Sequence, residues 1–494
     1  MRELQIAFIT NPVTRRWMRI LKIIEREETF TTTSLAQRLG ISQRTLMKDI
    51  HSIKEHFFES AAIYSNNSGF RFEEKDRLLY QARKEQLLEQ DVLFDLLEKI
   101  FYGEETELGE LADHYCYAET TLRRFLSKVQ PILKEYGLSV NFNPVTLIGE
   151  EANIRKFFFD FYYGGDLTPQ TVRPPDGLHQ VVLKGLSGKI EKKEVGTGLS
   201  IGAFYSLLYL TMMRVQQGQF LAVPKWAQEL VYKEADFQLL RLLVPIIERA
   251  YGIILPDEEL VWLHLIIVSR RTTNRPDQER LFLNHFNQWA ELEGAATAYF
   301  SEEFFEDWDR PHLETFLSAF LASRKLNDTL WPIWNKQQPE AEQLVIGQAA
   351  YEKNRVFLKN QQEKLQFSEA LFEDVVVSFT MFSELLLHAH QPKKTILFLL
   401  EGDSMVVQTI QLQAQRLLGE HYQLIFLPLH ELTEERLKSQ KTDLIVTNYR
   451  PYIFDYGLKE DYILLNPIPL EKDWVGIKQK LNPLLKSDST TSKP

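Results

Sequence analysis

Apolar residues between positions 33 and 57 recur at the spacing of two short helices that a glycine separates. Gly40 stands at the turn, where a positive φ is needed, and Ser42 is placed to cap the second helix. The inward-facing positions are Leu35, Ala36 and Leu39 in the first helix and Leu46, Ile50 and Ile53 in the second. This pattern predicts a helix-turn-helix.

The polar positions of the motif gather at the start and on the outer face of the second helix. They are Ser42, Gln43, Arg44, Thr45 and Lys48. A helix-turn-helix presents that end to the major groove of DNA, where Arg bonds a guanine edge and Ser, Thr and Lys reach phosphates. Two helices joined at a glycine also occur in many other helical proteins, so the motif alone leaves a purely structural role open.

The flanking segments extend the motif into a winged helix. Residues 63–72 read as two short strands about an Asn-rich turn, which predicts a β-hairpin wing whose Arg71 could meet a phosphate. Residues 13–28 form an amphipathic helix that would support the domain. Its apolar face is made by Trp17, Ile20, Leu21 and Ile24.

The motif occurs a second time. After a long helical stretch at 77–101, residues 111–133 align without a gap on the first copy, and residues 138–148 predict a second hairpin with Asn-Pro at its turn. The matched pairs are Leu111 on Leu35, Ala112 on Ala36, Cys116 on Gly40, Thr121 on Thr45, Leu122 on Leu46 and Arg124 on Lys48. Two winged helices in tandem are therefore expected.

The second copy departs from the first at its turn and helix start. Ala118 and Glu119 occupy the head of its recognition helix, where a carboxylate would oppose phosphate. Arg123 and Arg124 remain as cations. The second winged helix is predicted to be either an auxiliary DNA contact or a structural domain.

The pattern changes twice along the rest of the chain. Residues 164–200, rich in Gly, Pro and charge, predict a linker or interdomain loops. Residues 201–390 predict two helical bundles, because an amphipathic helix ending in Arg and a later apolar helix bearing His occur in each half. From residue 394, short apolar strands alternate with helices, including one at 432–440, which predicts a small doubly wound α/β domain.

Composition places the chain among soluble globular proteins and limits its partners. The net charge is −11, yet residues 1–60 carry ten Lys and Arg against seven Asp and Glu. Only this amino-terminal head is expected to meet phosphate. The single cysteine, the absence of a signal-like segment and the absence of a long apolar run predict a cytoplasmic protein without a membrane span.

In this order, the parts resemble the Mga/AtxA family of virulence and global transcription regulators of Gram-positive bacteria. The resemblance covers nearly the whole chain. It implies that the helical bundles are PTS regulation domains (PRDs), which the phosphocarriers HPr and enzyme I of the sugar phosphotransferase system can phosphorylate on His. It also implies that the carboxy-terminal domain is similar to a PTS enzyme IIB and supports homodimerisation.

The family's His motifs are carried over only where this sequence matches them. Arg214 and Arg324 fit the Arg of the first motif, but Leu207 and Leu317 stand where the family has His. The second motif is matched by Asp257, Glu258 and His264 in one bundle and, at its end only, by His388 in the other. His264 and His388 are the phosphoacceptor candidates, with a hydrogen-bonded core His as the alternative for His264.

The enzyme-IIB-like domain lacks the Cys that such enzymes carry after the first strand. Glu401, Gly402, Asp403 and Ser404 occupy that loop, so phosphotransfer is not expected there. No nucleotide-binding, metalloprotease or nucleophile motif is present, and no enzyme activity, cofactor or metal is predicted. The alternatives to a DNA-binding regulator are an RNA-binding antiterminator linked to the PTS and a non-catalytic PTS interaction protein.

The expected fold class is multidomain and mainly α. The predicted domains are a winged helix at 1–76, a second winged helix at 77–163, PRD-like bundles at 164–280 and 281–391, an enzyme-IIB-like α/β domain at 392–486 and a disordered tail at 487–494.

Overall fold

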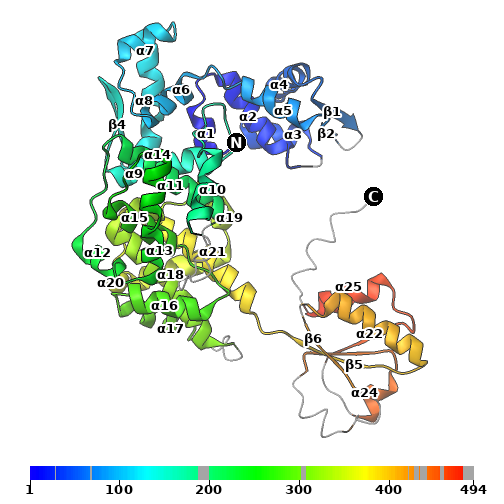
Figure 1. Ribbon diagram of the computed structural model, residues 1–494. Coiled ribbons are helices and arrows are strands. Elements are labelled where there is room, and N and C mark those ends of the chain that lie inside the picture. Colours follow the sequence, from blue (N-terminus) through cyan, green and yellow to red (C-terminus); the bar gives the residue numbers. More distant parts are fainter. Residues whose placement is uncertain are drawn as a thin grey trace. The chain divides into compact units, whose positions relative to one another are not determined.

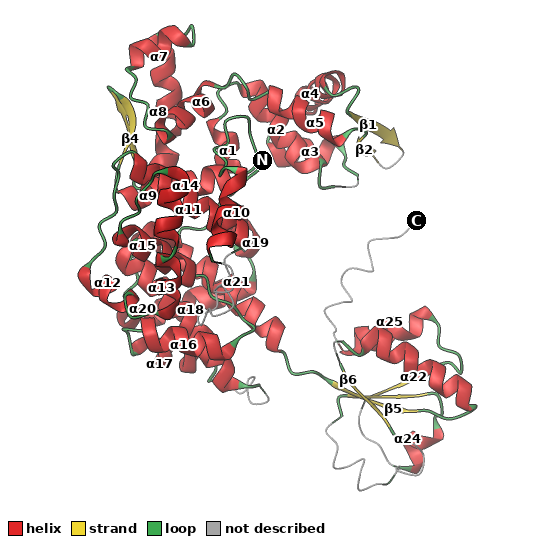
Figure 2. Cartoon of the chain, in the orientation of Figure 1, coloured by secondary structure: helices red, strands yellow, loops and turns green. Residues whose placement is uncertain are grey.

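The computed structural model describes residues 1–27, 29–66, 69–186, 200–301, 308–420, 422–427, 433, 442–456 and 461–481. The chain forms two compact units, Met1–Ala389 and His390–Pro494. Helices dominate the first unit, and the second contains a parallel sheet (Figure 2). None of the described helices is both long enough and apolar enough to cross a membrane.

The first unit begins with the predicted winged helix (Figure 1). Its elements are α1 (Glu3–Phe8), α2 (Pro12–Ile24), α3 (Thr32–Leu39), α4 (Gln43–His56), β1 (Ala61–Asn66), β2 (Gly69–Glu74) and α5 (Arg77–Gln86). The apolar positions predicted to face inward on α3 and α4 are buried, apart from the half-buried Leu39. Strands β1 and β2 pair antiparallel, which confirms the hairpin.

The helical stretch predicted at 77–101 is divided into two helices. Helix α5 ends at Gln86, and α6 (Val92–Phe101) begins only after a turn. Asp91 caps α6 by accepting from the backbone N–H of Leu93 at 3.2 Å, and the same carboxylate accepts from the backbone N–H of Thr10 at 2.7 Å. A new helix therefore begins at Val92, because its N-cap, Asp91, is held in place by a distant segment of the chain.

The second winged helix follows. Its elements after α6 are α7 (Leu108–His114), α8 (Glu119–Glu135), β3 (Ser139–Phe142), β4 (Val145–Ile148), α9 (Glu151–Phe158) and the π-helix η1 (Phe159–Tyr163). Strands β3 and β4 pair antiparallel, and Asn143–Pro144 lies at the turn between them, as the sequence predicts.

The remainder of the first unit is helical wherever it is described. Its elements are α10 (Asp176–Gly185), α11 (Ile201–Gln216), α12 (Lys225–Val231), α13 (Ala235–Arg241), α14 (Leu243–Tyr251), α15 (Asp257–Val268), α16 (Pro276–Phe286), α17 (Glu291–Tyr299), α18 (Arg310–Leu330), η4 (Pro332–Asn335), α19 (Pro339–Val345), α20 (Ala349–Leu365), η5 (Glu369–Leu371) and α21 (Phe372–His390). One continuous apolar core joins these helices to both winged domains.

The prediction of a linker or loops over 164–200 needs correction. Helix α10 lies inside that range, buries Leu178 and Val182, and packs against α14. All three Pro residues of this range lie before the helix, but Gly177 and Gly185 lie within it, and residues 187–199 lie outside the described part of the chain.

The second unit is a small α/β domain with four parallel strands in the order β6-β5-β7-β8. Its elements are β5 (Thr395–Leu399), α22 (Ser404–Leu418), β6 (Gln423–Phe426), β7 (Leu444–Thr447), α24 (Pro451–Asp455), β8 (Tyr462–Leu464) and α25 (Glu471–Leu481). Alternate side chains of β5 point to opposite faces, so Ile396 packs with α22 and α25 while Leu397 packs with α24.

The strands and helix α22 of this unit are as predicted, whereas α24 and α25 were not expected from the sequence. All but one residue of the helix predicted at 432–440 lies outside the described residues, as does the predicted tail at 487–494. The domain boundaries at 76, 163 and 280, and the PRD and enzyme-IIB likeness of these parts, stay predictions.

Candidate nucleic-acid interface

The turn of the first helix-turn-helix has the geometry that its sequence predicts. Gly40 has φ +64° and ends α3 in the left-handed region, where a side chain would be strained. Ser42 follows as the N-cap of α4, and its hydroxyl accepts from the backbone N–H of Thr45 at 3.1 Å. These two residues fix where α4 begins and in which direction its first turn points.

The first turns of α4 are open to solvent. Ser42, Gln43, Arg44 and Lys48 are exposed, and Thr45 is half-buried. Gln43 donates to the Thr33 hydroxyl at 2.9 Å, which ties the head of α4 to α3. Within the described chain, Arg44 and Lys48 form no ion pair, so both cations remain available to an external anion.

The acidic side chain closest in sequence to these cations is turned away from solvent. Asp49 is only 3% exposed and accepts from Arg16 Nη2 at 2.7 Å and from Trp17 Nε1 at 3.2 Å. The hydrogen bond to Asp49 raises the pKa of Arg16. This pairing anchors α4 on α2 and removes from the outer face a carboxylate that would repel phosphate.

The wing adds a third exposed cation. Arg71 lies on β2 opposite Tyr64 and is exposed. The hairpin is held near its turn by paired backbone hydrogen bonds between Phe70 and Phe30, which lies just before α3; each is 2.8 Å long. Residues 67 and 68 of the predicted turn lie outside the described chain.

The second copy repeats the turn but not the surface. Cys116 has φ +55°, close to the value of Gly40 on which it aligns. Ala118 provides no side-chain cap to α8, and Glu119 pairs with Arg123 at 3.5 Å. The Arg123 guanidinium also lies 4.5 Å from the centroid of the Phe142 ring. Arg123 is therefore engaged within its own domain, and Arg124 and Lys128 are further exposed cations of α8.

The structure does not give the two candidate phosphoacceptors the same environment. His264 is 3% exposed and packs against the rings of Phe237 and Phe286, with centroids at 5.7 and 6.2 Å. It lines an apolar cavity of about 330 Å³ together with Leu240. His388 lies in the last turn of α21 and is exposed.

A buried ion network joins the second winged domain to the helical body. Arg155 of α9 is 0% exposed and donates to Glu259 of α15 at 3.2 Å and to Glu151 at 2.8 Å. Arg214 of α11 binds Glu151 through two hydrogen bonds of 2.7 and 2.8 Å. The backbone N–H of Leu221 donates to Glu259 at 2.9 Å.

Sequence reasoning missed this network. The Glu151–Arg155 spacing of four residues within α9 was the one available signal, since its other contacts join positions that are far apart in the chain. Arg214 thus pairs with Glu151, a carboxylate of the second winged domain.

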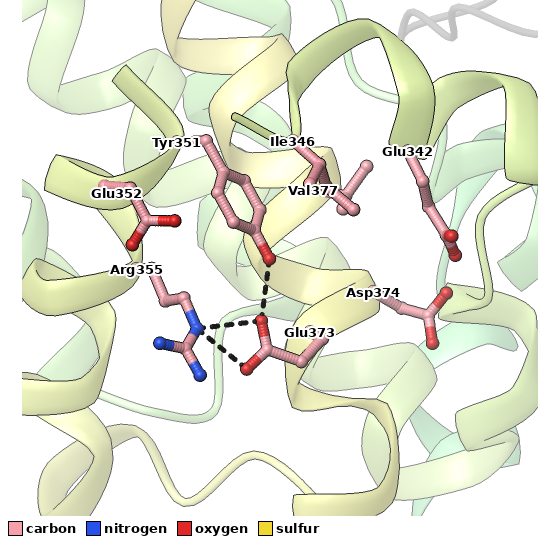
Figure 3. Close-up of a pocket in the computed structure, with 8 residues that line it drawn as sticks. All are labelled: Glu342, Ile346, Tyr351, Glu352, Arg355, Glu373, Asp374 and Val377. Atoms are coloured by element: carbon pink, nitrogen blue, oxygen red, sulfur yellow. Dashed lines mark hydrogen bonds and ion pairs between the residues drawn. The ribbon is translucent and has the colours of Figure 1, made fainter. Parts of the chain in front are cut away.

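Figure 3 shows a second cavity, of about 380 Å³, which α19, α20 and α21 line. Tyr351 and Arg355 both donate to the Glu373 carboxylate, at 2.8 and 2.9 Å. Burial raises the pKa of both Glu342 and Asp374. The lining is acidic and the Arg355 guanidinium is already paired, so this cavity does not extend the nucleic-acid interface.

The side chains of the loop after β5 make structural contacts within their own domain. Asp403 caps α22 by accepting from the backbone N–H of Met405 at 2.9 Å. Glu401 accepts from the Tyr452 hydroxyl, and its own backbone N–H donates to Asn448 at 2.8 Å. Both carboxylates of the loop are used to hold the domain together.

Two known families of helix-turn-helix domains match the two winged domains of this chain. The model of the Mga helix-turn-helix domain matches residues 79–162, and a helix-turn-helix domain model matches residues 16–71. The capsule synthesis positive regulator AcpB of Bacillus anthracis is 24% identical over 266 residues, which are 52% of this chain and 54% of AcpB. AcpA of the same organism, also a capsule synthesis positive regulator, is 22% identical over 293 residues, 56% of this chain and 57% of AcpA.

The chain thus spans about half the length of these two relatives. Both matched domains and both capsule regulators are consistent with the family that the sequence indicates. They confirm that this chain is similar to the Mga/AtxA family of transcription regulators.

Proposed function

We propose that this chain is a DNA-binding transcription regulator of the Mga/AtxA type and that α4 is its recognition helix. The observation that carries the proposal is the exposed pair Arg44 and Lys48 on a helix whose nearest carboxylate, Asp49, is buried against Arg16. Exposed cations of this kind bind phosphate with release of counterions, and Arg also reads guanine edges. The capsule regulators to which the chain is similar support the same role.

The charge distribution favours contact through the first winged domain. The whole chain is acidic, whereas its first 60 residues carry the positive excess. In the second winged domain Glu119 places a carboxylate at the head of α8 and, together with Phe142, already engages Arg123, while Arg124 and Lys128 are exposed. We therefore assign the second domain an auxiliary contact with DNA at most.

The test measures DNA binding of the full chain by fluorescence anisotropy as a function of salt. Replacing Arg44 and Lys48 by Ala should weaken binding and lower the slope of log K against log salt by about 2, near 0.9 for each phosphate contact. The control replaces the exposed Lys233 and Arg249 of the helical body by Ala, which changes the net charge equally. Equal slopes in both double variants would remove α4 from the interface.

For regulation, we propose that PTS carriers phosphorylate His388 in preference to His264. His388 is exposed, whereas His264 is packed between aromatic rings and would have to leave the core to meet a carrier. A phosphate adds about two negative charges, and in the last turn of α21 these would oppose the negative end of the helix dipole. Loosening of that turn would change the connection to the second unit.

Mass spectrometry after incubation with enzyme I, HPr and phosphoenolpyruvate tests the preference for His388 over His264. Phosphate should appear on the wild type and on His264→Ala, and disappear from His388→Ala. Phosphate on His264 alone, or on neither histidine, would contradict it.

We further propose that the second unit mediates homodimerisation. Met405 and Leu412 of α22 and Val475 of α25 are exposed apolar side chains on a domain of only about a hundred residues. Removing residues 394–494 should shift the protein from dimer to monomer in sedimentation. An unchanged mass would place the interface elsewhere.

A further inference from the structure

A cluster of buried cations lies where the second winged domain meets the helical body. Lys156 of α9 is 4% exposed and Arg324 of α18 is 5% exposed, and Arg270, just after α15, is half-buried. Arg324 Nη2 donates to the backbone carbonyl of Ser269 at 3.2 Å, which brings its guanidinium next to Arg270. Three segments far apart in the sequence supply these positive charges.

The carboxylates around the cluster are already occupied. Asp160 of η1 accepts from Lys156 at 2.8 Å through one oxygen and from the Tyr136 hydroxyl at 3.0 Å through the other. Glu135 pairs with Lys336 at 3.0 Å. Asp374 accepts from the backbone N–H of Gln337 at 2.8 Å. Neither guanidinium has a carboxylate partner within hydrogen-bond distance in the described chain.

Hydrogen-bond donors remain unused at the same place. Across the described residues, the Arg270 guanidinium donates no hydrogen bond, and the Arg324 guanidinium donates only to the Ser269 carbonyl and, at 3.5 Å, to the Ser323 hydroxyl. The indole N–H of Trp334, 2% exposed, also lacks a partner there. Asn335, the next residue, donates to the Arg324 carbonyl at 2.9 Å and so holds this segment against α18.

The electrostatics agree with this geometry. Burial lowers the pKa of Lys156 and of Arg270, while the Asp160 carboxylate acts in the opposite direction on both. Burial and the neighbouring Arg270 lower the pKa of Arg324 to about 9. Like charges held together in a poorly solvated place are unfavourable unless an anion joins them.

We propose that Arg270 and Arg324 form a binding site for a phosphate group, between η1, the end of α15 and α18. Guanidinium pairs suit phosphate because each presents two parallel N–H donors to two oxygens. A phosphate bound here adds negative charge where the described chain has an excess of cations. It also stabilises the packing of η1 from the winged domain against the two bundles. Free inorganic phosphate and a phosphate monoester share this chemistry.

The competing explanation needs no ligand. The carbonyl at the end of α15 stabilises Arg324, as cations at helix carboxyl ends commonly are, and solvent satisfies the half-buried Arg270. The two explanations predict different effects of phosphate on the stability of the protein, and measuring that effect requires no DNA. A negative result would reject the phosphate site and leave the proposed regulator function untouched.

The experiment is thermal denaturation of the full chain in increasing inorganic phosphate, with sodium chloride at matched ionic strength as the reference. A second series uses glucose 6-phosphate, to distinguish a monoester from the free ion. We expect a saturable rise in Tm of a few degrees with one or both phosphates and not with chloride. Isothermal titration calorimetry of the wild type then gives the affinity.

Two variants locate the site. Arg270→Gln and Arg324→Gln should bind phosphate about 10- to 100-fold more weakly, since each loses hydrogen bonds to a charged group. The control Arg280→Gln, at an exposed cation of α16, should respond like the wild type. In chloride alone, Arg270→Gln should raise Tm because it removes one of two like charges.

A wild type that phosphate does not stabilise, or an equal response in Arg270→Gln, would overturn the proposal. If Arg324→Gln does not fold, the wild-type titration and Arg270→Gln still decide the question.

Discussion

Glu259 is the residue whose loss should most clearly reveal how the second winged domain is attached. Its side chain is 0% exposed and accepts from Arg155 and from the backbone N–H of Leu221. In Glu259→Gln the amide oxygen can keep the bond to Leu221, but the amide NH₂ would face an Arg155 donor. Arg155 and Arg214 would then share Glu151 as their carboxylate.

Breaking a buried ion pair by neutralising one partner costs about 3–5 kcal/mol, because the other charge stays buried. We expect a loss of this size in the free energy of unfolding of the first unit, measured by urea denaturation followed through tryptophan fluorescence. Glu258→Gln, one residue away, half-buried and without a hydrogen bond or ion pair to the described chain, is the matched control and should change little. A loss below about 1 kcal/mol in Glu259→Gln, or one equal to the control, would refute the reasoning.

Three further predictions follow from local geometry. Gly40→Ala should destabilise the first winged domain by about 1–2 kcal/mol in thermal denaturation, because its φ is +64° although space for a Cβ is open. Gly202→Ala in helix α11, where space for a Cβ is also open, should not destabilise the protein. Equal losses of stability in Gly40→Ala and Gly202→Ala would contradict the strain argument. Cys116→Gly should stabilise by about 1 kcal/mol, since φ +55° suits Gly better, and a lower Tm would contradict this. The pKa of Glu340 lies below its ordinary 4.5, chiefly through hydrogen bonds from the backbone and from Lys22 that outweigh its burial. Ionised Glu340 should therefore add to the free energy of unfolding above about pH 4.5, and this gain should vanish as the pH falls through the lowered pKa. In acid-denaturation curves the wild type and Glu340→Gln should then converge, and a difference that stays constant with pH would contradict the prediction.

The helix-turn-helix could be predicted because its determinants are local. Gly40 and Ser42 specify the turn and the cap within three residues, and the structure has both as expected. The ungapped repeat placed Cys116 on Gly40, and the backbone at Cys116 does adopt a positive φ. The strands of the second unit followed from short apolar runs in the same way.

What the sequence did not indicate depends on contacts between distant positions. The turn before α6 exists because Asp91 binds Thr10, and helix α10 forms because Leu178 and Val182 find a partner in α14. Neither contact has a signal in the local pattern, and the Gly and Pro residues near α10 pointed to a loop. Likewise, Arg270 and Arg324 come together only through the folding of α15 against α18.

The central claim, that α4 meets DNA, can be tested by crosslinking because the chain has a single cysteine, the exposed Cys116 at the turn of the second copy. A photoreactive group on Cys116 probes the second winged helix, and the same group on Gln43→Cys in a Cys116→Ser background probes the first. We predict that a labelled duplex crosslinks strongly from position 43 and weakly or not at all from position 116. Crosslinks from position 116 alone, with DNA binding intact in both proteins, would contradict the account.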